Sequence, residues 1–325
     1  MKISLKELSN LCTDILISNG LDSTEAEVIV EDYLDAELRG KFSHGLSAFS
    51  LAIGAIEGRG KYVIKINDGP KVFIDGNHDI GHIVGRVALT EGIRKADLFG
   101  IGIVGICNIS RFSTPGTFAR FAAQKDYIGI VLEYGGKNFM VPFGGAELTL
   151  STNPIAIGIP TENEPFVLDM ATSERAIGFI NLARMLNTKI PLDWAVDNSG
   201  LPTDDPANVL GAVPFGGYKG FALALAIEIL CGPLVRTEIG KNGNLGKRGA
   251  LFIIISPELF HNKLLVFKKK VTNFLNEQKN AKKKNGINEI FIPGEKGERR
   301  KNEILKAGFI DIDDKILEEV KKLRK

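Results

Sequence analysis

The sequence has few cysteines and almost no net charge, and each shortage excludes a class of protein. Its three cysteines, Cys12, Cys107 and Cys231, are odd in number and far apart, which excludes a disulfide framework and a cysteine-rich zinc site. Lys and Arg number 41 against 39 Asp and Glu, so the formal net charge is only +2. That is too little for a whole molecule that binds polyanions. We therefore expect a cytoplasmic protein with no nucleic-acid partner.

Long apolar segments are also lacking. The longest late apolar run, residues 221–230, has ten residues and contains Glu228, whereas a membrane-spanning helix needs about 20 apolar residues. Residues 1–11 place charges between apolar residues and lack the continuous apolar stretch of a signal peptide. We expect no membrane partner.

Histidine is scarce as well, with four in the chain. His78 and His82 are four residues apart and could suggest two metal ligands, but no third ligand is evident nearby. We interpret the two histidines as packing at the start of a helix or as polarity near a substrate, and predict no metal.

The composition is that of an ordinary globular protein, with 44% hydrophobic and 25% charged residues. A chain of 325 residues is long for a single core, so we expect two lobes. Residues 1–39 have the periodicity of two amphipathic helices. Thr24 and Glu27 have the spacing of a capping box for the second helix, which we expect to end near Arg39.

The rest of the chain alternates between strand-like and helical patterns. Residues 83–98 are helical in pattern, and further helices are expected before residue 128, after Ser173, after Gly216 and at the C-terminus. Strand-like runs cover residues 63–66, 72–74, 101–107, 128–132, 155–159, 166–169 and 251–256. These patterns predict α/β layers in the central part.

One glycine pattern is misleading. Gly100, Gly102 and Gly105 match G-x-G-x-x-G, but the dinucleotide-binding fingerprint needs a strand before it and a helix opening within it. Here a helical pattern comes first and a strand-like run follows. We therefore interpret Gly100 as the glycine that ends a helix.

Several segments carry residues suited to binding or proton transfer. His44 lies in a Ser-His-Gly loop after a helix and could exchange a proton near neutrality, although a local cap is the alternative. Residues 165–174 read as a strand that passes into hydroxyl residues where a helix begins, which suits an anion or a plain helix cap. Arg111 stands at the end of a strand-like run and could bind a ligand or form a salt bridge. Val-Pro-Phe-Gly-Gly occurs twice, at 141–145 and 213–217, as turns that could admit a ligand or be ordinary turns.

These motifs together resemble one enzyme family over nearly the whole chain. The sequence is similar to the malate/L-lactate dehydrogenases of the second type, a family that includes sulfolactate and ureidoglycolate dehydrogenases and cyclic imino-acid reductases. The matching segments, in chain order, are S-H-G at 43–45, P-F-G-G at 142–145, S-T-N-P-I-A-I at 151–157, F-V-L-D-M-A-T-S at 166–173, P-T-D-D-P at 202–206, P-F-G-G-Y-K-G at 214–220 and I-P-G-E at 292–295.

The resemblance implies an α/β fold and a homodimer. A central mixed sheet would form a three-layer cofactor domain unlike the Rossmann fold, over residues 76–255. Residues 1–75 and 256–325 would form a mainly helical domain. The activity implied is hydride transfer between NAD or NADP and a small 2-hydroxy or 2-oxo acid.

The resemblance also implies roles for individual residues. The catalytic histidine of the family falls on His44, with Ser43 beside it. The cofactor contacts fall on Leu168, Asp169, Met170, Ala171, Thr172, Ser173, Lys219, Gly220, Gly294 and Glu295.

Two departures from the family pattern concern the substrate. The family commonly has an arginine where this chain has Ala48, and a second histidine where this chain has Arg111. A guanidinium can bind a carboxylate through two hydrogen bonds but does not exchange protons near neutrality. One hypothesis is therefore an active reductase whose carboxylate anchor has moved to Arg111. The other is a cofactor-binding protein that has lost turnover.

Overall fold

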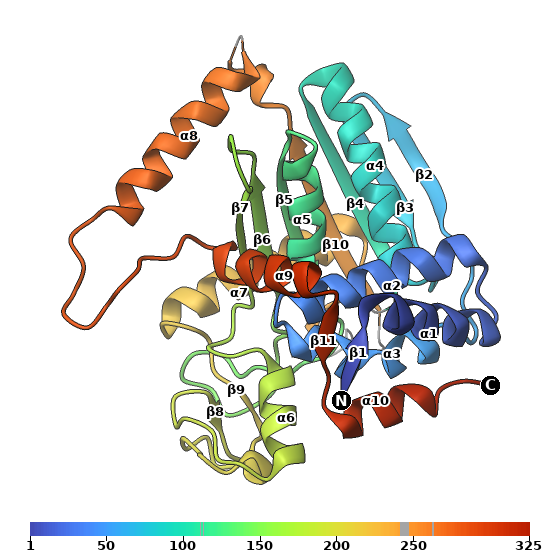
Figure 1. The fold of residues 1–325 in the computed structure, drawn as a ribbon, viewed down its shortest axis with the longest axis vertical. Coiled ribbons are helices and arrows are strands. Elements are labelled where there is room, and N and C mark those ends of the chain that lie inside the picture. Colours follow the sequence, from blue (N-terminus) through green and yellow to red (C-terminus); the bar gives the residue numbers. More distant parts are fainter. Residues whose placement is uncertain (111, 113, 241–246, 262) are drawn as a thin grey trace.

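The chain is built around one mixed sheet (Figure 1). The computed structural model describes residues 1–110, 112, 114–240, 247–261 and 263–325. Within these residues seven strands form one sheet in the order β2-β3-β4-β10-β5-β6-β7. The strands are β2 (Val63–Asp68), β3 (Lys71–Asp75), β4 (Ile101–Ile109), β5 (Ile128–Tyr134), β6 (Ile155–Ile159), β7 (Phe166–Met170) and β10 (Arg248–Ile255).

The neighbouring strands pair antiparallel except for one pair. β3 and β4 are parallel, because α4 (Gly81–Phe99) carries the chain back across the sheet between them. Gly100 ends α4 with φ 77°, a left-handed conformation that glycine adopts at low cost. The interpretation of Gly100 as a helix terminus, with no dinucleotide fingerprint, is confirmed.

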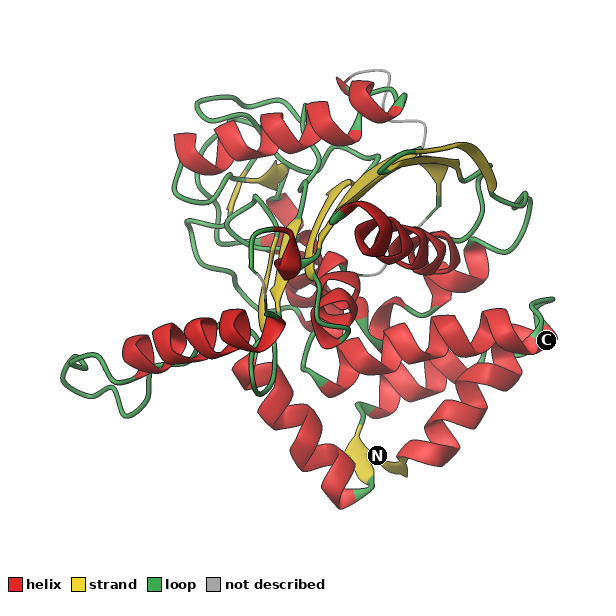
Figure 2. Ribbon diagram, turned by 90° about the horizontal axis from the view of Figure 1, so that it is seen from above, coloured by secondary structure: helices red, strands yellow, loops and turns green. Residues whose placement is uncertain are grey.

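Helices cover both faces of the sheet, as the view from above shows (Figure 2). α4 and α5 (Pro115–Gln124) pack on one face, and α7 (Tyr218–Cys231) packs on the other. β10 contributes to both cores, since Phe252 lies in the α4/α5 cluster and Leu251 in the α7 cluster. The alternation follows from the two-residue period of a strand. The three-layer arrangement expected from the resemblance is therefore present.

A helical layer joins the two ends of the chain. It contains α1 (Leu5–Ser18), α2 (Ser23–Leu38), the short α3 (Ser50–Gly54) and α10 (Asp314–Lys321), whose apolar residues share one buried cluster. β1 (Lys2–Ser4) pairs with β11 (Phe309–Asp311), so the two termini meet in one small sheet. The sequence-based expectation of helices from both terminal segments is met here.

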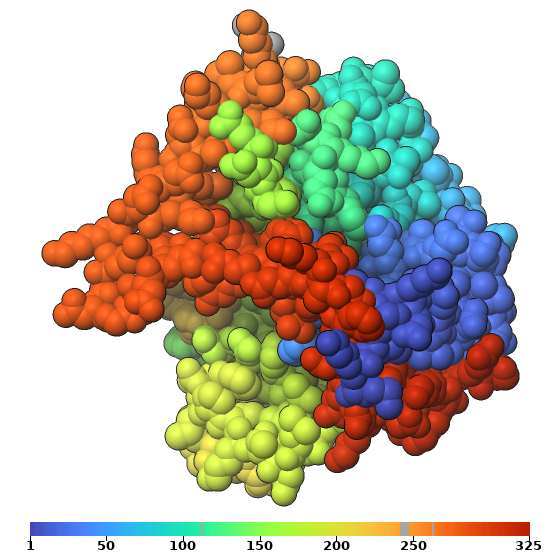
Figure 3. All heavy atoms as spheres, viewed as in Figure 1, coloured from blue at the N-terminus to red at the C-terminus, as the bar shows by residue number. Residues whose placement is uncertain are grey.

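Three details differ from the expectations. β2 and β3 pair with the large sheet, because β3 completes its edge beside β4, so residues 63–75 lie with the sheet and not with the helices. α8 (Leu264–Lys279) projects from the body with the loop that follows it (Figure 3) and buries no residue. The N-cap of α2 is Asp22, whose side chain accepts a bond from the Glu25 amide, so the capping box at Thr24 is wrong.

Two further regions border the sheet. α9 (Glu295–Ala307) lies beside α2. A small lobe contains α6 (Ile177–Leu186) and the paired β8 (Ala195–Val196) and β9 (Gly211–Ala212) around its own apolar cluster.

The apolar stretch that contains α7 is longer than the ten-residue run considered from the sequence. The stretch Tyr218–Val235 is long and apolar enough to cross a membrane by length and composition. α7 nevertheless packs on β5 and β10, and its Glu228 carboxylate accepts a 2.7 Å hydrogen bond from Asn153. One side of α7 is therefore packed in the fold, whereas its outer side is exposed.

A buried carboxylate fastens the helical layer to the rest of the molecule. Asp35 in α2 contacts Arg39 Nε at 2.8 Å, Arg120 of α5 at 3.2 Å and Lys301 of α9 at 2.7 Å. Burial alone would raise the pKa of Asp35, but Arg120, Arg39 and Lys301 outweigh it and lower the pKa to about 2. The ionised form is therefore the one that the fold stabilises.

We expect Asp35→Asn to destabilise the protein by about 3 kcal/mol at pH 7, because it leaves buried cations without their charge partner. In the parent, the contribution of Asp35 to stability is complete above pH about 4. It falls by about 2 kcal/mol as the pH drops toward 2, since the folded-state pKa lies below that of the unfolded chain.

Urea denaturation at pH 7 and across the acid range measures both effects. Asp14→Asn is the control, because Asp14 is half exposed and its Arg324 partner lies 3.6 Å away. Equal stability of Asp35→Asn and Asp14→Asn would contradict the prediction.

Candidate active site

The Ser-His-Gly segment forms a short turn of helix directly after α2. This turn, Phe42–His44, brings Ser43 Oγ to 3.0 Å from His44 Nδ1. A Cβ atom at Gly45 would lie 2.1 Å from Glu37 Oε2, and the same oxygen accepts a 2.9 Å hydrogen bond from the Leu46 amide. Glycine is required here so that the turn can close over the Glu37 side chain.

An ion pair connects this turn to the edge of the sheet. Lys41, at the start of the turn, contacts the Asp169 carboxylate of β7. Gly116 of α5 approaches from the other side, since a Cβ atom there would lie 2.4 Å from Asp169 Oδ2. Asp169 is thus held where the turn, β7 and α5 meet.

The small lobe also contacts the histidine turn. A Cβ atom at Gly178, in the first turn of α6, would lie 2.5 Å from Ser43 Cβ. The sequence prediction placed Ser43 with His44 as catalytic residues, and the structure packs their turn against α6 while Lys41, at the start of the turn, contacts β7.

Two of the predicted cofactor segments lie side by side. The Phe215 amide donates to the Thr172 carbonyl at 3.0 Å, and the Glu174 amide donates to the Val213 carbonyl at 2.8 Å. A Cβ atom at Gly220 would lie 2.4 Å from the Phe215 oxygen and 2.9 Å from that of Thr172. This close approach brings the Lys219–Gly220 turn against residues 168–173, with the Lys219 side chain exposed.

The third predicted segment lies at the other end of β7. The Val167 amide donates to the Pro293 carbonyl at 3.2 Å, and Gly294 precedes α9 with φ 98°. Glu295 accepts from the Ile292 amide at 3.0 Å and pairs with Lys279 at 2.7 Å. All the described segments that the resemblance assigned to the cofactor therefore border β7, the edge strand of the sheet.

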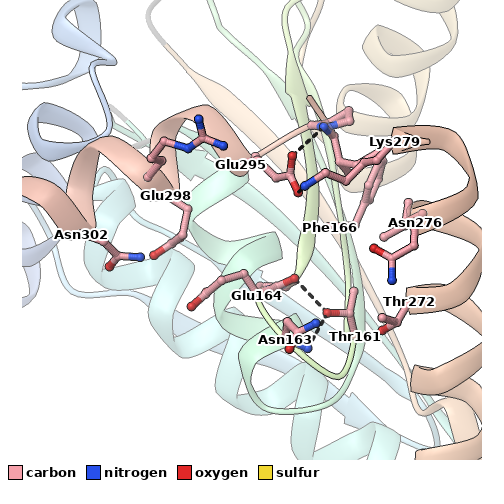
Figure 4. Close-up of a pocket in the computed structure, with 16 residues that line it drawn as sticks. Thr161, Asn163, Glu164, Phe166, Thr272, Asn276, Lys279, Glu295, Glu298 and Asn302 are labelled. Atoms are coloured by element: carbon pink, nitrogen blue, oxygen red, sulfur yellow. Dashed lines mark hydrogen bonds and ion pairs between the residues drawn. The ribbon is translucent and has the colours of Figure 1, made fainter. Parts of the chain in front are cut away.

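A cavity lies beyond each end of β7. One, of about 290 Å³, is bordered by Phe166, α8 and the start of α9, and the Lys279–Glu295 pair faces it (Figure 4). The other, of about 630 Å³, lies between the two Val-Pro-Phe-Gly-Gly turns beside Glu174. The repeated turns lie close together, since the Val141 amide donates to the Ala212 carbonyl at 3.1 Å.

The residues along β7 suit a nicotinamide dinucleotide. Such a molecule has aromatic rings at both ends and two phosphates between them. β7 has a cavity at each end, and the exposed Lys219 lies in the turn whose Gly220 packs on Thr172. The Thr172 and Ser173 hydroxyls are buried and donate to the Thr152 and Arg175 carbonyls, so they shape this end of the strand. The Lys219 ammonium and the two cavities suit an anionic, elongated ligand.

The chain matches known proteins along almost its full length. The sequence profile described as malate/L-lactate dehydrogenase matches residues 3–321. L-sulfolactate dehydrogenase of Methanocaldococcus jannaschii is 38% identical, over 96% of this chain and 93% of that protein. The NAD(+)-type ureidoglycolate dehydrogenase of Escherichia coli is 29% identical, over 97% and 93%. The crystal structure of malate dehydrogenase from Entamoeba histolytica superposes with a TM-score of 0.94 at 26% identity, covering 99% and 97%.

The chain belongs to the malate/L-lactate dehydrogenase family. Its fold is that of the family's solved structures. Membership places it among oxidoreductases of the malate/lactate dehydrogenase type.

Of the two positions that depart from the family pattern, the structure describes Ala48 but not Arg111. Ala48 is only 5% exposed and belongs to the apolar cluster of the helical layer. A cation introduced there would replace a methyl group in that cluster. Arg111, the proposed carboxylate anchor, lies outside the described residues.

Of the two histidines four residues apart, His82 is a packing residue, whereas His78 is exposed. His82 is buried, lies 3.0 Å from Asp32 and stacks on the Tyr33 ring at 5.0 Å. No group of three or more His, Cys, Asp or Glu suited to a metal occurs in the part of the chain that the structure describes.

The sequence reasoning missed Lys41, Glu37 and Gly116. Lys41 lies three residues before His44 and was readable as a nearby cation, but its partner Asp169 is 128 residues away. Glu37 acts by filling the space that Gly45 leaves, and only the folded chain shows that space.

Proposed function

We propose that this protein transfers hydride between NAD or NADP and a small 2-hydroxy or 2-oxo acid. The observation that carries the proposal is the Lys41–Asp169 ion pair, which holds the His44 turn against the segment 168–173. The turn that carries the proton-exchanging side chain is thereby tied to the predicted cofactor segment.

The residues of the chain have distinct tasks in this proposal. When bound, the nicotinamide cofactor supplies or accepts the hydride. His44 gives the proton to the carbonyl oxygen of the 2-oxo acid, or takes it from the hydroxyl in the reverse direction. Because His44 Nδ1 lies against the Ser43 hydroxyl, we assign the proton exchange to Nε2. Asp169 to Ser173, with Lys219–Gly220 and Gly294–Glu295, would hold the dinucleotide along β7.

The substrate is a small acid, and Arg111 remains our sequence-based proposal for its anchor. The named relatives act on sulfolactate, malate and ureidoglycolate, which favours a 2-hydroxy acid. A cofactor-binding protein without turnover, or a cyclic imino-acid reductase, is the alternative.

We also propose a cytoplasmic homodimer. The free cysteines Cys12, Cys107 and Cys231 are all buried as thiols, which suits a reducing compartment. α7 has an apolar outer side, where Leu225 and Ile229 are 40% and 55% exposed. The dimer itself rests on the family resemblance, and this side of α7 is the surface that we assign to the second copy.

We expect His44→Ala to lower the reduction rate about 10²- to 10⁴-fold with little change in cofactor affinity, because only proton transfer is lost. A panel of pyruvate, oxaloacetate, sulfopyruvate, 2-oxoglutarate and a cyclic imino acid, with NADH and NADPH, identifies the substrate for this comparison. Calorimetry measures the cofactor affinity.

An unchanged rate would remove His44 from the mechanism. Cofactor binding without turnover of any panel member would favour the protein that has lost activity. No binding of either cofactor at millimolar concentration would overturn both readings.

The surface assigned to the second copy can be tested by substitution in α7. Ile229→Lys should convert the protein to a monomer in light scattering at micromolar concentration, because it places a charge in the apolar contact. Leu98→Lys is the matched control, since Leu98 is 64% exposed at the end of α4. A parent protein that is already monomeric, or a dimer that survives Ile229→Lys, would count against the assigned surface.

A further inference from the structure

Arg175 has an unusual environment directly after the predicted cofactor segment. Its guanidinium carbon lies 3.9 Å from the centre of the Phe179 ring and 5.1 Å from that of the Trp194 ring. The residue is nevertheless exposed. Its side chain forms no ion pair with any residue that the structure describes.

The two aromatic contacts fix the cation without neutralising it. Aromatic faces attract a guanidinium through their quadrupole and restrict its long side chain. They do not occupy the planar fork of N–H donors, which matches the oxygens of a carboxylate or a phosphate. A cation held in this way loses little further freedom when an anion binds.

The position of Arg175 connects it to both parts of the candidate site. The Ser173 hydroxyl donates to the Arg175 carbonyl at 2.9 Å, which ties the residue to the cofactor segment. Its side chain covers the first turn of α6 at Phe179, and the neighbouring Gly178 packs against Ser43. Arg175 therefore lies within one helical turn of the residue that contacts the histidine turn.

The nearby carboxylates do not form an ion pair with Arg175 in the described part of the chain. Glu174 and Asp193 line the 630 Å³ cavity next to Arg175 and Trp194 in sequence. The guanidinium is thus an exposed cation without an ion pair among the described residues, and it follows directly after Glu174, which lines the cavity.

We propose that Arg175 binds an oxyanion of the ligand held in this site. This inference rests on the proposed function, in which both ligands are anionic. The oxyanion is the carboxylate of the 2-oxo acid or a phosphate of the dinucleotide, and both fit the same fork of donors. Arg175 is accordingly a binding residue additional to those that the sequence indicated.

Trp194 makes this assignment testable without turnover. It is the single tryptophan of the chain, so its emission reports on the Arg175 contact. We expect the emission to change saturably when the protein is titrated with pyruvate or the panel's best 2-oxo acid, or with inorganic pyrophosphate and NADH.

The variant Arg175→Met keeps an apolar stem against the two rings and removes the charge. It should weaken binding of the responsible ligand roughly 10- to 100-fold, the usual effect of losing a hydrogen-bonded charge. Arg175→Lys should restore binding only in part, because an ammonium cannot form the two-pronged contact. Arg94→Gln is the control, an exposed arginine of α4 whose partner is Glu91.

The arms of the experiment separate the sources of the oxyanion. A loss confined to the 2-oxo acid, seen as a raised KM with little change in kcat, assigns the carboxylate to Arg175. A loss confined to pyrophosphate and NADH assigns a phosphate. An uncharged ester of the same 2-oxo acid should react equally well with the parent and with Arg175→Met in the first case.

Two outcomes would overturn the inference. One is a ligand that binds by calorimetry without changing the Trp194 emission. The other is equal affinity of Arg175→Met and the parent for every ligand, which would leave Arg175 as a stacking residue only. Failure of the unmodified protein to bind NADH, NADPH or any 2-oxo acid is a different result, because it overturns the proposed function itself and this inference with it.

Discussion

The arrangement of the site depends on the burial of one carboxylate. Asp35 gathers cations from α2, α5 and α9, and Arg39 extends the network to Glu298 of α9. An unpaired charge in this position would be costly, so the helices must meet where the cations can reach Asp35. The residues that follow Arg39 therefore lie next to β7, the edge strand of the sheet. Lys41 contacts Asp169 there, which ties the turn that carries His44 to β7.

The sheet edge determines which segments can share a ligand. β7 is the last strand, so its outer side is open to the chain that precedes α9 at Pro293 and Gly294. The turn at Gly220 closes on Thr172 at the other end. Three segments distant in sequence thus line one strand, with a cavity at each end of it. An elongated anionic ligand suits this layout better than a compact one.

Local pattern predicted the elements of this fold well and their long-range pairing poorly. The helix that ends at Gly100 and the strand that follows it were readable, because glycine and apolar periodicity act within a few residues. The pairing of β1 with β11 was not, since it joins residues about 300 positions apart. For the same reason the sequence did not reveal the Lys41–Asp169 ion pair. It also did not reveal that Glu37 occupies the space beside Gly45. The family resemblance supplied His44 and the segments along β7, whereas Arg175 matched no motif and emerged only from its contacts with Phe179 and Trp194.

We propose that the dinucleotide lies along β7 with its nicotinamide beside His44. A crystal structure of the protein with NADH and an unreactive 2-oxo acid analogue tests it most directly. We expect the dinucleotide between residues 168–173 and the Gly220 and Gly294 turns, with the analogue's carbonyl oxygen within hydrogen-bonding reach of His44. Cofactor density on another face of the sheet, or a nicotinamide ring turned away from His44, would contradict it.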